Sequence, residues 1–252
     1  MDYATRTDLY ELLLDMIPIP TKRNMVWCPD EERFSVCLIE FRCHPYMKYV
    51  LYNMCNVYGG TDAVMYIIHG IDNEEYVKEM VKDMTNVKLV KLNIHNVNIA
   101  SYNELMTSYE LYTHIKTEYV LMFQMDTLIR KRIPEKFFQY QYVGAPWIMY
   151  ARDIERAPDV VFGNKLVGNG GFSLRNVARM KDICKTHPYT NNRINEDVFL
   201  TNHLDEDEIP SVDIAKEFSV EMIPYDDPVG MHRIWVYMPF DYVRKITKPC
   251  LE

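Results

Sequence analysis

Apolar runs and helical segments alternate through the first half of this chain, and this alternation limits the folds that the chain can adopt. The run at 119–123 is short and rich in β-branched and aromatic residues, which is typical of a strand buried on both faces of a sheet. Strands are also predicted at residues 34–39, 62–69 and 87–92. Segments with helical spacing lie between them, at 45–58, 73–84 and 101–115. The order strand, helix, strand predicts an α/β fold with a mostly parallel sheet flanked by helices.

The rest of the chain departs from this rhythm. A helix is predicted at 3–16, and Pro18 and Pro20 end it. After Arg130 we predict helices at 134–138, 177–184 and 195–204, strands at 142–147 and 215–220, and a surface loop at 150–165. No repeat or low-complexity linker divides the sequence, so we expect one domain over 34–252, preceded by the helix and loop of 1–33, with a change of character near residue 130.

Composition and charge exclude several classes of protein. The 252 residues are 48% hydrophobic and 25% charged, which indicates a globular chain with ample core. The net charge of -8 argues against a nucleic-acid-binding surface, because phosphate backbones need clustered Lys and Arg. It does not exclude a nucleotide ligand, whose charge a metal can neutralise locally.

Cysteine usage and hydropathy indicate the cellular compartment in which the protein is expected. The 6 cysteines form no CxxC pair, and buried free thiols are the simplest interpretation. No signal peptide opens the sequence, and no apolar run has the length of a membrane span. We therefore expect a cytoplasmic protein in a reducing setting.

The strand predicted at 119–123 ends on a polar pair, Gln124 and Asp126. The carboxyl edge of a parallel sheet is where open α/β folds bind ligands. Asp126 is therefore a candidate ligand for a hard divalent cation that holds a diphosphate. The alternative is a capped turn in which Asp126 bonds local backbone N–H groups.

Three later motifs are also candidates. The glycines of 168–171 lack the spacing of a dinucleotide or P-loop motif, and they either let a backbone pass close to a ligand or form a tight turn. The acidic start of the helix at 195 offers Asp197 as a general base, or is only a stabilising first turn. His232 is either a metal ligand or an ordinary core or surface histidine.

Taken together, these motifs resemble those of the GT-A glycosyltransferases. In that fold a DxD-type metal motif, a glycine loop, an xED motif and a late histidine follow one another, here at 124–126, 168–171, 195–197 and His232. The resemblance is closer still to a family of glycosyltransferase-like proteins of largely unknown function, found in fungi, bacteria, algae and large DNA viruses. Its pattern appears here as EFR (40–42), YN (102–103), FQMDTLI (123–129), VGAPW (143–147), VGNGGFSLR (167–175), NEDVFL (195–200), FSVE (218–221) and PVGMHRIW (228–235). The ordered set is specific, although each motif alone is weak.

This resemblance implies a GT-A (Rossmann-like) fold, with a nucleotide-binding half at 34–130 and an acceptor half at 131–252. It implies a hexosyl- or pentosyltransferase that takes a nucleoside-diphosphate sugar, UDP-linked, with Mn²⁺ or Mg²⁺ as cofactor and a glycan or other hydroxyl compound as acceptor. Because members occur in large DNA viruses, a host cytoplasm is compatible with it.

The same resemblance suggests residue roles. The nucleotide would contact Glu40, Arg42, His69, Asp72, Tyr102, Asn103, Gln124, Met125 and Asp126. The sugar and acceptor would contact Trp147, Asn169, Gly170 and Gly171. Asp126 and His232 would hold the metal, Asp197 would be the base of an inverting transfer, and Glu196 would bind or orient the acceptor. Gln124 departs from the usual pattern, since it replaces the first acid of DxD and binds a cation less strongly than a carboxylate.

Two other functions compete with this one. A module of the same fold could hold a nucleotide sugar or glycan without turnover, and UDP release in the presence of acceptor separates it from an enzyme. A nucleotidyltransferase would need a basic residue near a triphosphate, and the sequence contains no glycine-rich loop with a lysine for that purpose.

Overall fold

The structure is a computed structural model that describes residues 3–148, 166–190 and 194–251. The loop predicted at 150–165 lies outside the described residues.

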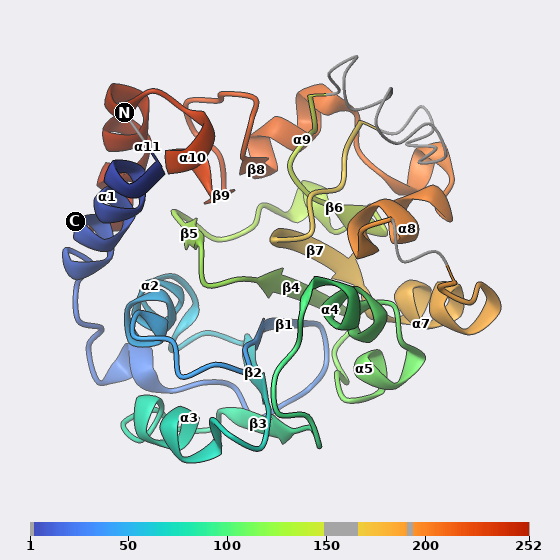
Figure 1. Cartoon of the computed structure of the whole chain (residues 1–252), viewed down its shortest axis with the longest axis horizontal. Helices are drawn as coiled ribbons and strands as arrows, with labels where there is room; N and C mark the ends of the chain where they lie inside the picture. The colour runs from blue at the N-terminus through green and yellow to red at the C-terminus, as the bar shows by residue number, and fades with distance from the viewer. Residues whose placement is uncertain (1–2, 149–165, 191–193, 252) are drawn as a thin grey trace.

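A six-stranded, mostly parallel sheet forms the centre of the molecule (Figure 1). Its strands are β1 (Phe34–Ile39), β2 (Val64–His69), β3 (Lys88–Lys91), β4 (Tyr119–Phe123), β6 (Tyr142–Val143) and β7 (Phe172–Asn176). The order is β3-β2-β1-β4-β7-β6, with the first four strands parallel and β7 antiparallel to both β4 and β6. The predicted α/β fold is confirmed.

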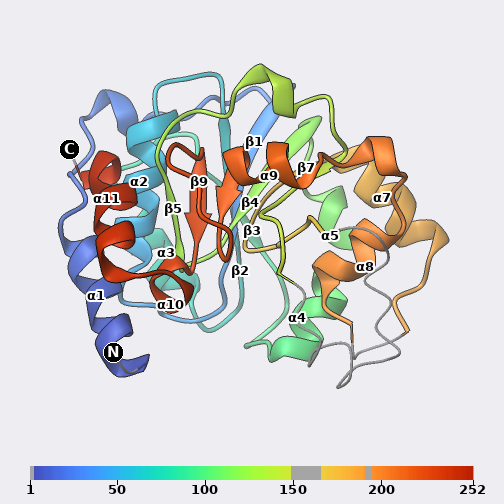
Figure 2. The ribbon, with the colours of Figure 1, turned by 90° about the horizontal axis from the view of Figure 1, so that it is seen from above.

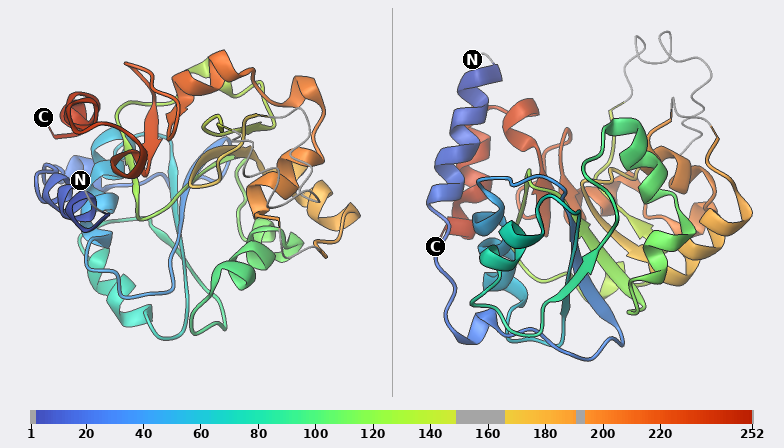
Figure 3. Two further views of the ribbon diagram at one scale, coloured as in Figure 1. Left: turned by 45° about the horizontal axis from the view of Figure 1, so that its top comes forward. Right: turned by 60° about the horizontal axis from the view of Figure 1, so that its bottom comes forward.

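Helices cover both faces of this sheet. Successive side chains of a strand point to opposite faces, so each central strand packs against both helical layers. In β1, Val36 and Leu38 belong to one hydrophobic cluster, while Cys37 and Ile39 belong to the other. The first cluster includes residues of α1 (Tyr3–Asp15), α2 (Met47–Tyr58), α3 (Glu74–Met80), α10 (Ile234–Tyr237) and α11 (Phe240–Leu251). The second includes residues of α4 (Ile99–Met106), α5 (Tyr109–Thr113), α7 (Val177–Thr186) and α8 (Glu196–Asn202). The two layers are visible on either side of the sheet in Figure 3.

A second sheet of three short strands joins distant parts of the chain (Figure 2). It contains β5 (Thr127–Ile129), β8 (Ser219–Val220) and β9 (Gly230–His232), in the order β5-β9-β8. β5 runs antiparallel to β9, and β8 runs parallel to it. Strand β5 follows β4 directly, so this sheet brings the region around residue 230 to the carboxyl end of β4.

The two ends of the chain pack together. Helix α1 lies beside α10 and α11 in Figures 1 and 2, and the ring of Tyr10 stacks on Trp235 with 3.8 Å between ring centroids. None of the described helices is long and apolar enough to cross a membrane.

Some elements differ from the predictions. The helix predicted at 101–115 is two helices, because the Ser108 hydroxyl accepts a hydrogen bond from the amide of Leu111 and starts α5 there. The strand predicted at 215–220 is mostly α9 (Val212–Phe218), whose Ala215 and Phe218 are buried at helical spacing. Three short 3₁₀ helices complete the described elements, η1 (Arg23–Met25), η2 (Glu135–Phe137) and η3 (Glu206–Glu208).

Candidate active site

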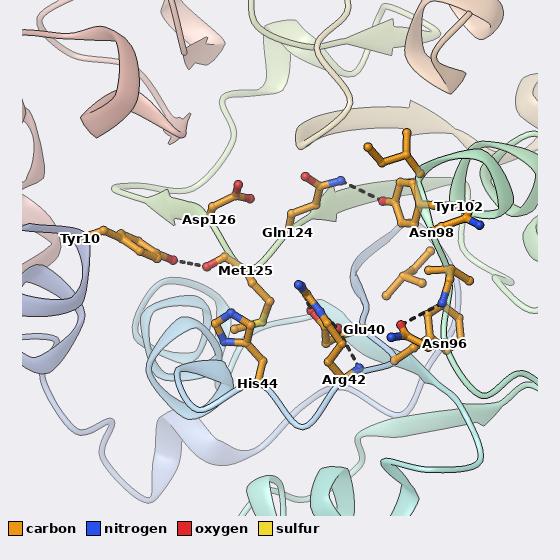
Figure 4. A pocket seen from close by; sticks show the side chains of 14 residues that line it. Tyr10, Glu40, Arg42, His44, Asn96, Asn98, Tyr102, Gln124, Met125 and Asp126 are labelled. Carbon is orange, nitrogen blue, oxygen red and sulfur yellow. Dashed lines mark hydrogen bonds and ion pairs between the residues drawn. The ribbon is translucent and has the colours of Figure 1, made fainter. Parts of the chain in front are cut away.

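A pocket of about 390 Å³ opens at the carboxyl ends of β1 and β4 (Figure 4). This volume lies within the range of small-molecule sites, and the place is where open α/β sheets bind ligands. The lining residues are Tyr10, Ile39, Glu40, Phe41, Arg42, His44, Asn96, Val97, Asn98, Ile99, Tyr102, Gln124, Met125 and Asp126. Six of the residues predicted to meet a nucleotide are among them.

The pairing of β5 with β9 brings Asp126 to His232. Thr127 is the Cα partner of His232, so Asp126, one residue earlier, faces Arg233. The amide of Arg233 donates to the carbonyl of Asp126 at 3.0 Å. His232 Nε2 consequently lies 3.3 Å from Asp126 Oδ1, although the two residues are far apart in sequence.

The other nitrogen of His232 is held by a carboxylate. Nδ1 lies 3.1 Å from Glu221 Oε1, and the second oxygen of Glu221 accepts a hydrogen bond of 2.8 Å from the side chain of Asn169. Nε2 is buried and makes no hydrogen bond among the described residues. A carboxylate behind Nδ1 is the arrangement that fixes the orientation of metal-binding histidines and leaves Nε2 to the metal.

The charges around Asp126 and His232 depend on each other. Burial lowers the pKa of His232, but the carboxylates of Asp126 and Glu221 outweigh it and raise that pKa to about 9. Burial raises the pKa of Asp126, but His232 and Arg233 outweigh it, so the pKa of Asp126 is lowered overall. Without a cation, the pair is therefore an ion pair at neutral pH, and a cation would replace the proton of His232.

These two donors fit a divalent cation. An oxygen and a nitrogen that each lie about 2.0–2.3 Å from one ion, at right angles, are roughly 3 Å apart, close to the 3.3 Å observed. The described residues contain no group of three or more His, Cys, Asp or Glu side chains arranged for a metal. Two protein donors suffice for Mg²⁺ and similar ions when substrate phosphates and waters complete the coordination.

Gln124 is oriented by Tyr102. Its Nε2 donates to the Tyr102 hydroxyl at 2.9 Å, and its Oε1 accepts no hydrogen bond from the described residues. The amide carbonyl is thus available to a metal or a ligand hydroxyl in the pocket that both residues line. The Tyr102 ring, supplied by α4, closes that side of the pocket.

Arg42 is held by Glu40 at the end of β1. The buried Glu40 accepts from Arg42 Nε at 2.8 Å and from Nη2 at 2.7 Å. This bidentate bond fixes the plane of the guanidinium, while the Arg42 side chain stays 59% exposed. Nη1 makes no hydrogen bond among the described residues and remains free to meet an anion in the pocket.

Two adjacent glycines lie between His232 on one side and the carboxylates of α8 on the other. A Cβ at Gly171 would lie 2.3 Å from His232 Nε2, and a Cβ at Gly170 would lie 2.1 Å from Glu196 Oε1 and 3.2 Å from Asp197 Cβ. Any side chain at either position would displace one of these groups. Glycine is therefore needed here because neighbouring side chains approach the backbone closely, and not because of a turn conformation. The glycine pair therefore separates the metal candidates from the carboxylates of α8 by the width of one backbone.

Asp197 sits at the start of α8 with its carboxylate held by backbone amides. Oδ2 accepts from Gly170 N at 3.0 Å, and Oδ1 accepts from Val198 N at 2.8 Å. Burial, with the neighbouring charge of Glu196, raises the pKa of Asp197 to about 7. A carboxylate that titrates near neutral pH is suited to general-base chemistry.

Glu196 takes part in a buried ion pair that the sequence did not predict. Its carboxylate forms a two-bond ion pair with Arg175, 3.0 Å on each side, and both side chains are buried. Both carboxylates lie beside Gly170, but Asp197 bonds its amide while Glu196 bonds the buried Arg175. Both oxygens of Glu196 are thus engaged by Arg175, and its predicted role in binding or orienting an acceptor stays a prediction.

Four other predicted residues lie away from the pocket. His69 is buried, and its Nδ1 contacts the carbonyl of Gly70; Asp72 is exposed and pairs with His95. Asn103 binds the amide of Glu196 and ties α4 to α8. Trp147 lies against Gly168, at 3.0 Å from the position of a Cβ there.

Sequence reasoning missed three contributors to the site. Glu221 belongs to the FSVE motif, but nothing in that motif indicates which side chain it would orient. His44 and Tyr10 line the pocket. Tyr10 lies in a helix outside the predicted domain, and only the fold places it there.

Two structures of LgtC are among the solved structures that resemble this chain. One is an active-site mutant of LgtC, with a TM-score of 0.53 and 13% identity, covering 79% of this chain and 86% of LgtC. The other is the galactosyltransferase LgtC in complex with donor and acceptor sugar analogues, with a TM-score of 0.55 and 11% identity, covering 86% of this chain and 95% of LgtC. At such low identity these matches show the fold alone, and they confirm the predicted GT-A architecture.

The sequence comparisons are more limited. A search of curated proteins found no match. Residues 86–232, more than half of the chain, match one family profile. The chain therefore belongs to the family described as a protein of unknown function (DUF5672).

Proposed function

We propose that this chain is a metal-dependent glycosyltransferase that moves a sugar from a UDP-linked donor to a hydroxyl group of a glycan or another acceptor. The observation that carries the proposal is the convergence of Asp126 and His232 beside a pocket at the carboxyl edge of the sheet. The fold shared with LgtC agrees with it.

Residues in the pocket and beside it would supply what a nucleoside diphosphate needs. Asp126 and His232 would hold Mn²⁺ or Mg²⁺, which when bound stabilises negative charge on the leaving diphosphate. Arg42, fixed by Glu40, would donate to a phosphate oxygen through its free edge. Gln124 Oε1 would bind a ribose hydroxyl or the cation.

The glycine pair and Asp197 would act on the acceptor side. The carboxylate of Asp197 would take the proton of the acceptor hydroxyl as the acceptor oxygen bonds to the anomeric carbon of the sugar. The bond from that carbon to the diphosphate oxygen would break, and the diphosphate would leave with the electron pair. Attack opposite the leaving group inverts the anomeric configuration. The buried pair of Glu196 with Arg175 would position the helix that carries the base.

A ligand screen tests this proposal. Nucleoside diphosphates and their sugars, UDP- and GDP-linked, are compared for thermal stabilisation of the chain with Mn²⁺, because a ligand that binds only the folded state raises its apparent stability. UDP and a UDP-sugar should stabilise it more than the GDP compounds, and only with Mn²⁺ present. Absence of stabilisation by any of them would contradict a nucleotide-sugar enzyme.

A second measurement separates an enzyme from a binding module. UDP release is followed with the stabilising donor, Mn²⁺ and a panel of glycan acceptors. The enzyme should release UDP in step with acceptor glycosylation, whereas a module that only binds the donor would release none.

A further inference from the structure

Tyr10 contacts two segments that carry the candidate metal ligands. It lies in α1 and is 6% exposed. Its hydroxyl donates to the carbonyl of Met125, the residue before Asp126. Its ring stacks on Trp235, three residues after His232, at 3.8 Å between centroids and an interplanar angle of 14°. One side chain from the start of the chain therefore contacts both segments.

The local structure explains why such a contact would matter. Asp126 lies in the turn between β4 and β5, outside the register of the β5–β9 ladder, which begins at Thr127. The amide of Arg233 and the side-chain pairs of Asp126 with His232 and Arg233 join the turn to the end of β9. Arg233 itself has a left-handed backbone, with φ of 49°. A non-glycine residue in that conformation needs support from its surroundings.

We propose that Tyr10 is a positioning residue that clamps the turn at Met125 to the segment at Trp235, and so fixes the distance between Asp126 and His232. This inference rests on the proposed metal site. It also makes helix α1, which precedes the predicted domain, a part of that site. Tyr10 also lines the pocket, so the same side chain forms part of the pocket wall (Figure 4).

A pair of matched tyrosine variants tests the clamp. Tyr10→Phe keeps the ring stacked on Trp235 and removes the bond to Met125. Tyr119→Phe is the control, because its hydroxyl donates to another backbone carbonyl, that of Phe138, at the opposite end of β4. Hydrogen exchange is measured over residues 123–129 and 230–236 without metal, and Mn²⁺ affinity is measured in the presence of UDP by electron paramagnetic resonance.

The clamp predicts faster exchange in both segments for Tyr10→Phe only, with Mn²⁺ bound about 10-fold more weakly, the usual cost of losing support behind a metal ligand. Trp235→Leu, which removes the stack and keeps the hydroxyl bond, should also weaken Mn²⁺ binding, and it serves if Tyr10→Phe does not fold.

Two results are decisive against the idea. If the native chain binds Mn²⁺ but Tyr10→Phe matches the control in exchange and in affinity, the clamp is wrong and the proposed function stands. If the native chain binds no Mn²⁺ with UDP, the proposed metal site fails and the positioning role fails with it.

Discussion

Asp197 combines backbone hydrogen bonds, which favour its charged form, with burial, which opposes it. Burial is the larger effect, so the pKa of Asp197 is raised to about 7. A base must be unprotonated to act, so kcat/KM should fall with decreasing pH below about 7 and level off above it. The pH profile of sugar transfer checks this expectation.

Asp197→Asn keeps the shape of the side chain and removes the base. Transfer should drop by about 10²–10⁴-fold, the usual contribution of a positioned acid or base, while UDP-sugar affinity stays close to native. The acidic limb of the pH profile should also disappear. A mutant with near-native transfer, or a product that keeps the donor's anomeric configuration, would show that Asp197 is not the base of an inverting reaction.

Arg42→Ala removes the guanidinium that Glu40 orients toward the pocket. UDP affinity should weaken by about 1–3 kcal/mol, the range for a charge-assisted hydrogen bond. Arg132→Ala is the matched control, since Arg132 is an exposed arginine that bonds the carbonyl of Val57 and does not line the pocket. Calorimetric titration with UDP compares the two, and equal affinities in folded proteins would exclude a phosphate contact by Arg42.

For single residues, the sequence identifies candidates well, but it does not show where their side chains point. Asp126, Arg42 and Gln124 follow strands, and the carboxyl edge of a parallel sheet is a place that topology predicts. Glu196 and Asp197 are adjacent acids, and nothing in their order says which of them faces Arg175 in the core. Glu221 was not assigned a role for a similar reason, because its partner His232 becomes its neighbour only through the pairing of β8 with β9.

Strand β7 and helix α8 are joined by the ion pair of Arg175 with Glu196. Arg175 is fully buried and also donates to Ser173 Oγ and Tyr112 Oη, so the charge is well compensated. Removing one partner leaves an uncompensated buried charge, which costs about 3–5 kcal/mol. This pair therefore fixes α8 against the sheet.

Arg175→Met should lower the free energy of unfolding by that amount, about 3–5 kcal/mol, in a urea titration. Arg179→Met is the comparison, since it breaks the pair of Arg179 with Glu208, whose side chains are 27% and 20% exposed. The loss there should be smaller, because water screens a partly exposed pair. Equal losses in the two variants would contradict a special role for the buried pair.

The elements that sequence predicted well are those whose signal is local. Three of the four parallel strands, β1, β2 and β4, are buried throughout, and their apolar runs indicate this directly. Strands β5, β8 and β9 have only two or three residues each. β5 pairs with β9 from a distant part of the chain, and strands this short carry no clear local pattern, so the sequence did not predict them.

The whole molecule places its candidate site where distant segments meet. The pocket lies at the edge of the main sheet, β9 supplies His232 from the second sheet, and α1 covers one side with Tyr10. A division of the chain near residue 130 stays a prediction, and β5 and β9, from either side of it, form one sheet. The fold could be predicted from sequence because its order of elements is regular. The contact between Asp126 and His232 could be predicted only through the resemblance to known motifs.

The central claim is that Asp126 and His232 hold a cation that binds the nucleotide diphosphate. The most direct measurement is calorimetric titration of UDP into the native chain, Asp126→Asn and Asp241→Asn, with and without Mn²⁺. Asp241 is an exposed acid on α11 and serves as the control. Mn²⁺ should tighten UDP binding at least about 10-fold, or 1.4 kcal/mol, in the native chain and in Asp241→Asn, and it should have no such effect in Asp126→Asn. UDP binding that ignores Mn²⁺ in the native chain, or a full Mn²⁺ effect in folded Asp126→Asn, would contradict the claim.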